Sequence, residues 1–542
     1  MTTSIGAVYA WSSFNAPLCR TLGVVAPAAS DWELGSVVPI FSFAALTLGI
    51  GTSVLGTWSE RSGPRMTAAA ATACWSGGLC ITSLATYTHT LPLCYLGYGI
   101  LGGLGWGLGY ISPVSNLMKW FPDRRGLATG MALASFGGGA ILASPMNIYF
   151  MNKFFVPPDY LGTLKDITVV TENGVRYAQS NTGEMIEVVV ATAADVAKLP
   201  GELMEGVYVV GTGSTGVAET FLSLGGIHCA AMLAGTLMMR IPRDGWSPEG
   251  YIIPDEEAQS TVKGVSLNTT MKTPQFWLLW TVVFGNAIAG VSIMACAKDI
   301  MNDVFVGAFP GLITAGFLSA YISSLSAANG TGRFAWATAS DYLGRKNTIY
   351  TFGLAIPIAL GLPYVATMVS DGGSGTLPLF IFYGGSVLAI SFYGGIFSVL
   401  PAYIADLFGM KNPGAIHGRA LTAWSASAVV GPTILTTLRK SSYDDAVSEL
   451  ALVCDPQVFY DTYGATISEL QTLIDTKTVT IPSLMEIVPA GTHDPTPHIY
   501  DSTFYTMSGF IAVAMLCNAM IKPVPREKFD DGGDDDICEK KY

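Results

Sequence analysis

Arg333 has the clearest potential for chemistry in this sequence, because it places a permanent charge inside an apolar run. It lies in the stretch NGTGRFAWATASDYLGRK, eight positions before the next charge, Asp341. If Asp341 ends a membrane helix, Arg333 lies about 12 Å inside it, close to the midplane of a hydrocarbon layer about 30 Å thick. A guanidinium at that depth costs about 2.5–3.5 kcal/mol, which predicts a cavity or an anionic partner nearby.

The partner of Arg333 is expected to come from outside the chain. We find no acid at a similar depth in another predicted span, and the remaining acids near the membrane stand at helix ends: Glu60, Asp123, Asp341 and Asp406. A planar carboxylate matches the fork of guanidinium donors, so a small carboxylate is the predicted ligand. The alternative is an Arg satisfied by backbone carbonyls or by Asn329, one turn earlier.

The composition indicates a membrane protein. The chain has 542 residues, of which 50% are hydrophobic and only 13% charged, whereas soluble domains carry about 25% charged residues. The apolar residues fall in blocks of about 20 to 25, the length that spans a bilayer. The net charge of -12 comes from polar segments and the acidic tail Asp530–Asp536, which we expect to be solvated. The expected partner of the apolar blocks is membrane lipid, and no nucleic-acid partner is expected.

Twelve spans are predicted, in two sets of six. Their approximate limits are 1–20, 34–57, 66–88, 92–118, 126–151, 218–240, 274–297, 310–339, 347–369, 377–404, 417–438 and 502–522. The expected domains are a first bundle (1–240), a cytosolic central loop (241–273), a second bundle (274–522) and an acidic cytosolic tail (523–542). The boundaries are those at which charge and polarity return.

Two long insertions occupy matching places in the two halves. With the central loop in the cytosol, Lys and Arg gather in cytosolic loops, and the short outer loops hold only Arg20 and Lys298. The outer insertions are then 152–217, where Asn173-Gly174 predicts a hairpin between β-rich runs, and 439–501, which has short helical patterns. Loops of this length are usually folded. They are expected either to form an outer cap or to be passive additions.

A charged turn occurs once in each half. The segments are GTWSERSGPR (Gly56–Arg65) and ASDYLGRK (Ala339–Lys346). An acid can cap a helix N-terminus and Arg can hold helix C-termini or carboxylates, so such a cluster can act as a two-state latch. The simpler explanation is topological, since positive residues stay in the cytosol.

These turns resemble the loop signature of the major facilitator superfamily, although that family usually has Asp in the place of Glu60. The resemblance implies an all-α membrane protein of twelve transmembrane helices in two six-helix bundles, the major facilitator fold, here with two extramembrane insertions. It also implies alternating access to a central site. The gating residues would be Glu60, Arg61, Arg65, Asp123, Arg124, Arg125, Asp341 and Arg345.

A narrower resemblance is to the oxalate–formate antiporter family. It is carried by 107–140, with the core KWFPDRRGLATG, by GAVYAWSSF at 6–14, and by TPQFWLLW at 273–280. Because 6–14 matches the middle of that family's first helix, the sequence is expected to begin within helix 1. Arg333 matches the family's substrate-binding Arg on helix 8.

Two departures from these families narrow the expected substrate. Oxalate–formate antiporters carry a Lys on helix 11, where this chain has Trp424, and one cation favours a monovalent anion over a dianion. The neighbouring monocarboxylate transporters usually have Asp four residues before their Arg, where this chain has Asn329. Helix 8 therefore has no carboxylate to carry a proton.

By family match, aromatic residues line the rest of the site beside Arg333 and Asn329: Tyr9, Trp11, Tyr110, Phe136, Tyr393, Phe397 and Trp424. The predicted function is secondary transport of small organic anions, monocarboxylates foremost, by facilitated transport or exchange. The alternatives are oxalate/formate-type dicarboxylate exchange and a transporter-like receptor without net flux. We expect a monomer that is not an enzyme, without cofactor or metal, because no nucleophile–base set or metal-ligand spacing is found.

Overall fold

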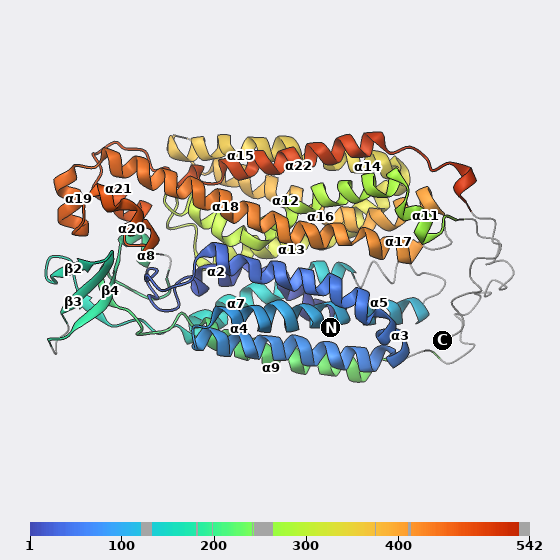
Figure 1. The fold of residues 1–542 in the computed structure, drawn as a ribbon, viewed down its shortest axis with the longest axis horizontal. Coiled ribbons are helices and arrows are strands. Elements are labelled where there is room, and N and C mark those ends of the chain that lie inside the picture. The colour runs from blue at the N-terminus through green and yellow to red at the C-terminus, as the bar shows by residue number, and fades with distance from the viewer. Residues whose placement is uncertain are drawn as a thin grey trace.

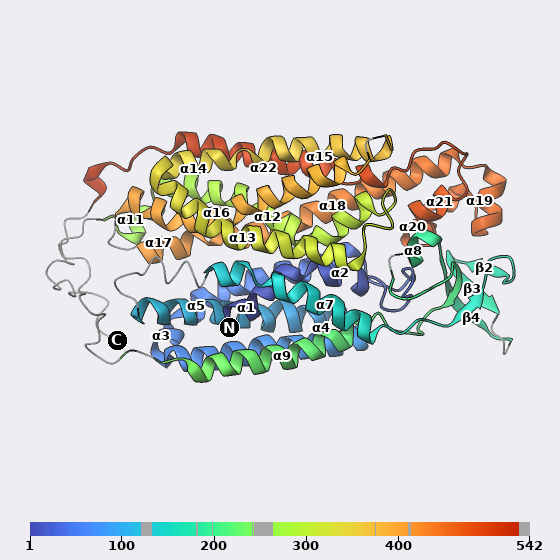
Figure 2. The ribbon, with the colours of Figure 1, turned by 180° about the vertical axis from the view of Figure 1, so that it is seen from behind.

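The protein is an elongated helical bundle with a folded cap at one end (Figure 1). The computed structural model describes residues 1–120, 133–179, 183–197, 199–240, 242, 264–373, 375–409 and 413–529. Within these, only the backbone is described for residues 53, 54, 56, 57, 60, 61, 111, 114, 115, 118, 119, 413–415 and 526. The early membrane helices form the lower half and the later ones the upper half in Figures 1 and 2.

The lower half contains α1 (Thr2–Ile5), η1 (Gly6–Ala10), α2 (Ser12–Leu18), α3 (Leu34–Tyr87), α4 (Leu91–Cys94), η2 (Tyr95–Gly102), α5 (Gly103–Trp120), α7 (Ala140–Phe154) and α9 (Val217–Met238). The long α3 covers two predicted spans and breaks at Gly63. The segment η2 is a π-helix within the glycine-rich fourth span. Small residues there let α3 pack closely, as is common between membrane helices.

The upper half contains α11 (Leu267–Met271), α12 (Pro274–Phe305), α13 (Ala315–Leu343), α14 (Arg345–Phe352), α15 (Ala355–Ser370), α16 (Leu377–Phe408), α17 (Pro413–Ala420), α18 (Thr422–Val453) and α22 (Asp501–Met520), with η5 (Arg526–Lys528) beyond it. Two of these helices run past the predicted limits at 297 and 438. Both α12 and α18 therefore carry charged residues from the bundle toward the cap.

The helices make this an integral, multi-pass membrane protein. In the described part of the chain, nine helical segments are long and apolar enough to cross a membrane. The helix α13, which carries Arg333, is not one of these nine, because Ser, Thr, Asn and Arg lower its hydropathy. Each of the twelve predicted spans contains described helix, which is consistent with the predicted count.

The cap consists of a sheet and one short helix from the first insertion, and of short helices from the second. The strands β1 (Tyr160–Gly162), β2 (Val169–Glu172), β3 (Val175–Gln179), β4 (Met185–Ala191) and β5 (Gly206–Val209) form an antiparallel sheet of order β1-β5-β4-β3-β2. The helices are α8 (Ala193–Val196), α19 (Pro456–Tyr463), η3 (Ile467–Glu469), α20 (Leu470–Asp475), α21 (Ile481–Met485) and η4 (Thr496–His498). We call this end of the molecule the insertion end.

The two insertions contact each other through the hairpin predicted at Asn173-Gly174, which is confirmed. Both turn residues have positive φ, 52° and 81°, as a tight hairpin turn requires. The carbonyl of Gly174 accepts hydrogen bonds from Thr476 (3.0 Å) and Thr478. The guanidinium of Arg176 lies 5.3 Å from the ring centre of Tyr463, and burial lowers its pKa.

The two halves of the bundle meet where α7 packs on α13 and α3 on α18. Ser326 of α13 donates to the carbonyl of Gly137 (2.7 Å) and accepts from the backbone N–H of Ala140 (3.1 Å). Closer to the insertion end, the hydroxyl oxygens of Ser144 and Ser319 are 3.0 Å apart. Hydroxyl groups thus join the halves directly beside the residues around Arg333.

Candidate substrate-binding site

Arg333 lies inside the interface between the halves. It is 4% exposed. Its Nε donates to the side-chain oxygen of Asn329 (3.3 Å), and Nη2 donates to the hydroxyl of Tyr9 on η1 (3.4 Å). Both bonds are long and both partners are neutral. Among the described residues, no carboxylate pairs with Arg333, so its charge is not compensated within this part of the chain.

Two aromatic rings enclose the guanidinium. Its central carbon lies 5.4 Å from the ring centre of Phe136 and 5.1 Å from that of Phe397 on α16. Rings at this distance attract a cation through their π-faces. Tyr9 and Tyr110 both contact Phe136, at 5.2 and 5.6 Å between ring centres. The structure therefore gathers these predicted residues from both halves around one cation.

A second aromatic group continues the enclosure toward α18. Tyr393 accepts a hydrogen bond from Trp424 Nε1 at 2.9 Å, and both residues contact Phe397. Trp106 lies between the two groups. Its ring centre is 6.0 Å from that of Phe136 and 5.5 Å from that of Trp424. Trp106 was not predicted, although it stands one helical turn before Tyr110 in α5. That spacing is the signal that could have identified it.

Two buried donors in this shell lack acceptors. Asn329 Nδ2 and Trp106 Nε1 have no hydrogen-bond partner in the described structure. Asn329 uses its oxygen for Arg333, so its amide N–H groups remain for another acceptor. An anion bound at Arg333 would meet one of these unpaired donors on the same helix, which lowers the cost of leaving it buried.

Glycines allow the helices to come this close. A Cβ added at Gly137 would lie 3.2 Å from Arg333 Nε, and one at Gly394 would lie 2.2 Å from the carbonyl oxygen of Asn329. Any larger residue at Gly394 would push α16 away from α13. The position of the aromatic shell around Arg333 therefore depends on backbone contact between these helices.

Trp11 lies apart from this shell. Its ring contacts Phe14, Tyr98 and Phe221 within the lower half. In the residues that the structure describes, it makes no contact with Arg333. Its place in the predicted binding set stays a prediction, and the structure places it in the core of the lower half.

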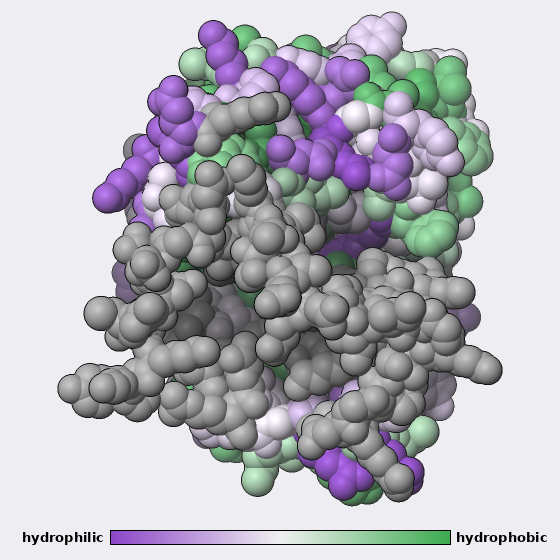
Figure 3. Space-filling model, turned by 90° about the vertical axis from the view of Figure 1, so that its right-hand side faces the viewer, coloured by the Kyte–Doolittle hydropathy of each residue, from purple (hydrophilic) through white to green (hydrophobic). Residues whose placement is uncertain are grey.

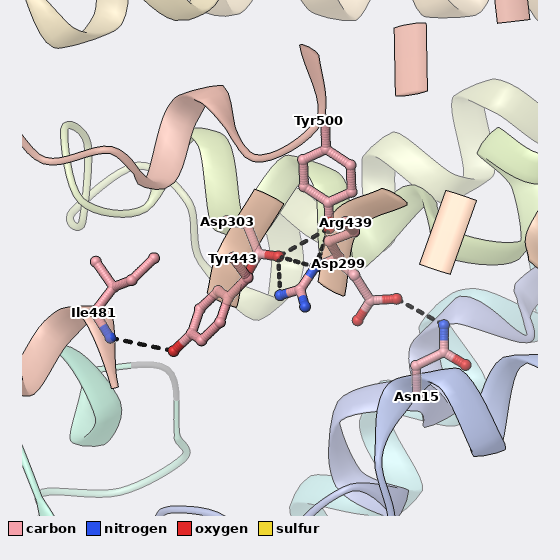
Figure 4. A network of polar contacts seen from close by, with 7 residues as sticks. All are labelled: Asn15, Asp299, Asp303, Arg439, Tyr443, Ile481 and Tyr500. Atoms are coloured by element: carbon pink, nitrogen blue, oxygen red, sulfur yellow. Dashed lines mark hydrogen bonds and ion pairs between the residues drawn. The ribbon is translucent and has the colours of Figure 1, made fainter. Parts of the chain in front are cut away.

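A polar network at the insertion end was missed by the sequence interpretation (Figure 4). Asp299, 8% exposed on α12, accepts a 2.6 Å hydrogen bond from Asn15 on α2, which also donates to the carbonyl of Ala295. One turn later, Asp303 forms a 2.7 Å ion pair with Arg439 of α18. Tyr500 donates to Asp303 and accepts from Arg439, both at 2.9 Å. Asn15–Asp299 joins the halves here.

The two charged turns are closely alike. Gly63 has φ 77° and ψ 166°, and Gly344 has φ 80° and ψ 147°, backbone values that favour glycine. Two residues after each glycine, a basic side chain holds a helix C-terminus. Arg65 donates to the carbonyls of Leu237 and Met239 at the C-terminal end of α9, and Lys346 donates to those of Ala519 and Ile521 at the C-terminal end of α22.

Four residues after each glycine, a Thr hydroxyl donates back to the glycine carbonyl at 3.0 Å, from Thr67 and from Thr348. The repeat seen in the sequence is thus a repeat of hydrogen bonds as well. Lys346 is the structural counterpart of Arg65, because it stands at the same offset from the glycine. It was not among the predicted gating residues, which include its neighbour Arg345.

Arg345 makes the ionic contacts of the second turn. It pairs with Asp341 at 2.6 Å and approaches Asp406 at 3.6 Å, and both acids are largely exposed. The side chains of Glu60 and Arg61 and all of Asp123, Arg124 and Arg125 fall outside the described residues. At this end, hydrophilic side chains gather over the upper half (Figure 3).

Comparison with solved structures defines the class of fold. A bacterial homologue of the human lysosomal transporter Spinster, in an inward-facing form, superposes with a TM-score of 0.56 at 13% identity, over 96% of each chain. The inward-open xylose transporter XylE of E. coli gives 0.51 at 12% identity, over 92% of this chain and 97% of that one. The chain has the major facilitator fold.

Sequence comparison narrows the resemblance. Apicoplast pyruvate carrier 1 of Toxoplasma gondii is 25% identical over 78% of this chain and 72% of its own length. The oxalate:formate antiporter of Oxalobacter formigenes is 23% identical over 79% of each chain. Monocarboxylate transporter 11 of Mus musculus is 28% identical over 27% of this chain and 33% of its own. No family model matches the sequence. These relatives are transporters, which confirms the resemblance predicted from the motifs.

Proposed function

We propose that this chain is a secondary transporter of small organic anions, with monocarboxylates as the preferred class. The observation that carries the proposal is Arg333, a buried cation with only neutral partners among the described residues. A carboxylate would complete its bidentate hydrogen bonds and accept from the free amide of Asn329. The relatives named for pyruvate and for oxalate and formate support this substrate class.

A single cation favours a monocarboxylate over a dicarboxylate. The side chains that contact Arg333 within the described residues are Asn329, Tyr9, Phe136 and Phe397, none of which is basic. At the position where the resemblance expects a Lys, Trp424 donates to Tyr393. A second carboxylate group would therefore be buried without a counter-charge, which is costly. Oxalate/formate-type exchange is the second candidate, supported by the antiporter relative.

The arrangement of the halves supports the proposal that the substrate moves by alternating access. Arg333 and its aromatic shell lie between them, the charged turns lie at one end, and the Asn15–Asp299 contact lies at the other. Contacts at either end that form and break in turn would expose the site to one side at a time. The proposed unit is a monomer with bundles at 1–240 and 274–522.

The test is counterflow in proteoliposomes. Vesicles loaded with unlabelled pyruvate and diluted into labelled pyruvate should accumulate label transiently, whereas protein-free vesicles should not. A panel of formate, pyruvate and oxalate as internal counter-substrates then ranks the two candidate classes. Purified protein that binds pyruvate and shows no counterflow would contradict transport and favour a receptor.

A further inference from the structure

A cavity of about 600 Å³ lies at the insertion end, between the two halves and beneath the cap. Its lining comes from the end of α2, from α7, α12 and α18, and from both insertions. None of the residues predicted to bind substrate lines it. Its size is in the range of small-molecule sites, and by the predicted orientation it opens to the outer side.

Five basic side chains line this cavity: Arg20, Lys298, Arg439, Lys440 and Lys477. Three of them already have oxygen partners: Arg439 pairs with Asp303, Lys440 with Glu33 at 2.9 Å, and Lys477 with the carbonyl of Asp31. The other two, Arg20 and Lys298, make no hydrogen bond or ion pair with any described residue. These are the two cations that the sequence places in the short outer loops.

Arg20 and Lys298 line the same cavity. Arg20 Nε is buried without a hydrogen-bond partner. Because Lys298 lines the cavity as well, an anion held there would be attracted by both cations. Two cations that line one cavity without a hydrogen-bonded carboxylate partner can attract a small anion.

The acids nearby are engaged by other groups. Asp31 accepts from the backbone N–H groups of Leu22 (2.8 Å), Gly23 (3.0 Å) and Ala28 (2.9 Å). Asp195 accepts two hydrogen bonds from Thr192, one from the backbone N–H (3.1 Å) and one from the hydroxyl (2.8 Å). Asp299 accepts from Asn15. The acids that line the cavity are Glu33, Asp195, Asp299, Asp303 and Asp444. Among the described residues, none of them forms a hydrogen bond or ion pair with Arg20 or Lys298.

We propose that Arg20 and Lys298 form a second anion site, which binds a small carboxylate in the outer cavity before it reaches Arg333. The site rests on the proposed function for its ligand class, but its existence depends only on the cavity and the two unpaired cations. Its role would be to raise the local concentration of substrate between the halves and to shield it from the acids of the cap.

The test separates the two sites by disabling the central one. Equilibrium binding of labelled pyruvate to detergent-purified Arg333→Gln should persist, and adding Arg20→Gln or Lys298→Gln should weaken it by roughly tenfold or more. Lys298→Arg should retain binding. Lys440→Gln, which removes a paired cation of the same cavity, is the matched control and should leave binding unchanged. Thermal unfolding of each variant shows whether it is folded.

Absence of pyruvate binding to folded Arg333→Gln would overturn the outer site. Equal pyruvate binding by Arg333→Gln and by the variant that also carries Arg20→Gln and Lys298→Gln would overturn it as well. Neither result bears on Arg333. In uptake assays, Arg20→Gln or Lys298→Gln with Arg333 intact should raise the half-saturating pyruvate concentration and leave the maximal rate largely unchanged. If wild type binds at the outer cations yet shows no counterflow, the proposed transport fails while the outer site stands.

Discussion

Two arginines on membrane helices, Arg333, which is buried, and Arg439, which is half-buried, have opposite surroundings. Arg439 on α18 has an ion pair with Asp303 and a hydrogen bond with Tyr500. Arg333 on α13 has two long contacts with neutral groups and two aromatic faces. The first charge is compensated within the chain, and the second is not compensated by any described residue. Arg439 thus has its counter-charge within the fold, whereas the proposed function assigns Arg333 to a ligand.

The comparison predicts that stability and transport will respond in opposite ways at the two positions. Removing one member of a buried ion pair leaves the other charge unpaired and destabilises the protein. Removing a cation that has no counter-charge relieves a desolvation cost instead. The variants below break or sharpen this contrast.

The largest effect is expected for Arg333→Gln. Loss of a charged, bidentate contact with the substrate should lower labelled pyruvate uptake by roughly 100-fold, while thermal unfolding stays equal or moves to higher temperature. Wild-type uptake by this variant would contradict the proposed binding role. Unfolding of the variant would show instead that Arg333 holds the helices together through Asn329 and Tyr9.

Arg439→Gln should act on stability. Asp303 would be left unpaired among partly buried groups, and the free energy of unfolding should fall by roughly 2–3 kcal/mol, less than for a fully buried pair. The measure is thermal or denaturant unfolding, with uptake normalised to folded protein. Arg439→Gln combined with Asp303→Asn should recover part of the loss, because no lone charge remains. Loss of uptake at unchanged stability would reverse the assignment of the two arginines.

Arg333→Lys tests geometry apart from charge. An ammonium keeps the charge but cannot make the planar two-pronged contact. Uptake should fall by roughly tenfold, between wild type and Arg333→Gln, in a titration of initial rate against pyruvate concentration. Uptake equal to wild type would show that the site needs only a point charge.

Trp424→Lys would bring a second cation toward the first. The variant loses the hydrogen bond to Tyr393, so pyruvate uptake should fall a few-fold, while the ratio of oxalate to pyruvate uptake should rise. Trp424→Phe, which removes the same bond without adding charge, is the matched control. An unchanged ratio would mean that this position of α18 does not face the substrate.

The smallest effect is expected at the charged turn. Asp341→Ala removes an exposed partner of Arg345, worth about 0–1 kcal/mol. If the turn acts as a latch, the change should slow uptake a few-fold and leave equilibrium pyruvate binding unchanged, because a latch affects the conformational step and not the binding site. Equal loss of binding and uptake would argue against a gating role.

The helices, the repeated turns and the buried cation could be predicted from the sequence, because each depends on a local pattern. A long apolar run predicts a helix, a glycine next to charged residues predicts a turn, and a single charge within an apolar run marks Arg333. It also indicated most of the residues that surround Arg333, through the family resemblance. Their role in binding stays a prediction, since contact alone does not show it.

Contacts between distant segments were beyond the sequence. Asp299 was overlooked because the seventh span was ended at 297, whereas α12 continues to Phe305 and brings this acid to Asn15. Trp106 was passed over within a glycine-rich run. Lys346 was left out of the predicted gating residues, although the backbone turn at Gly344 directs this side chain, and not Arg345, to the end of α22.

The contact between the two insertions makes the cap a binding pair on one chain. Thr476 and Thr478 hold Gly174, and Arg176 faces Tyr463, yet these groups are tied to different halves of the bundle. In the proposed alternating-access cycle, the two insertions would separate when the insertion end opens and bind again when it closes. Because both belong to one chain, they would bind again at a high effective concentration. A few modest contacts suffice to keep such a pair associated, so the lifetime of this contact would set how often the outer cavity opens.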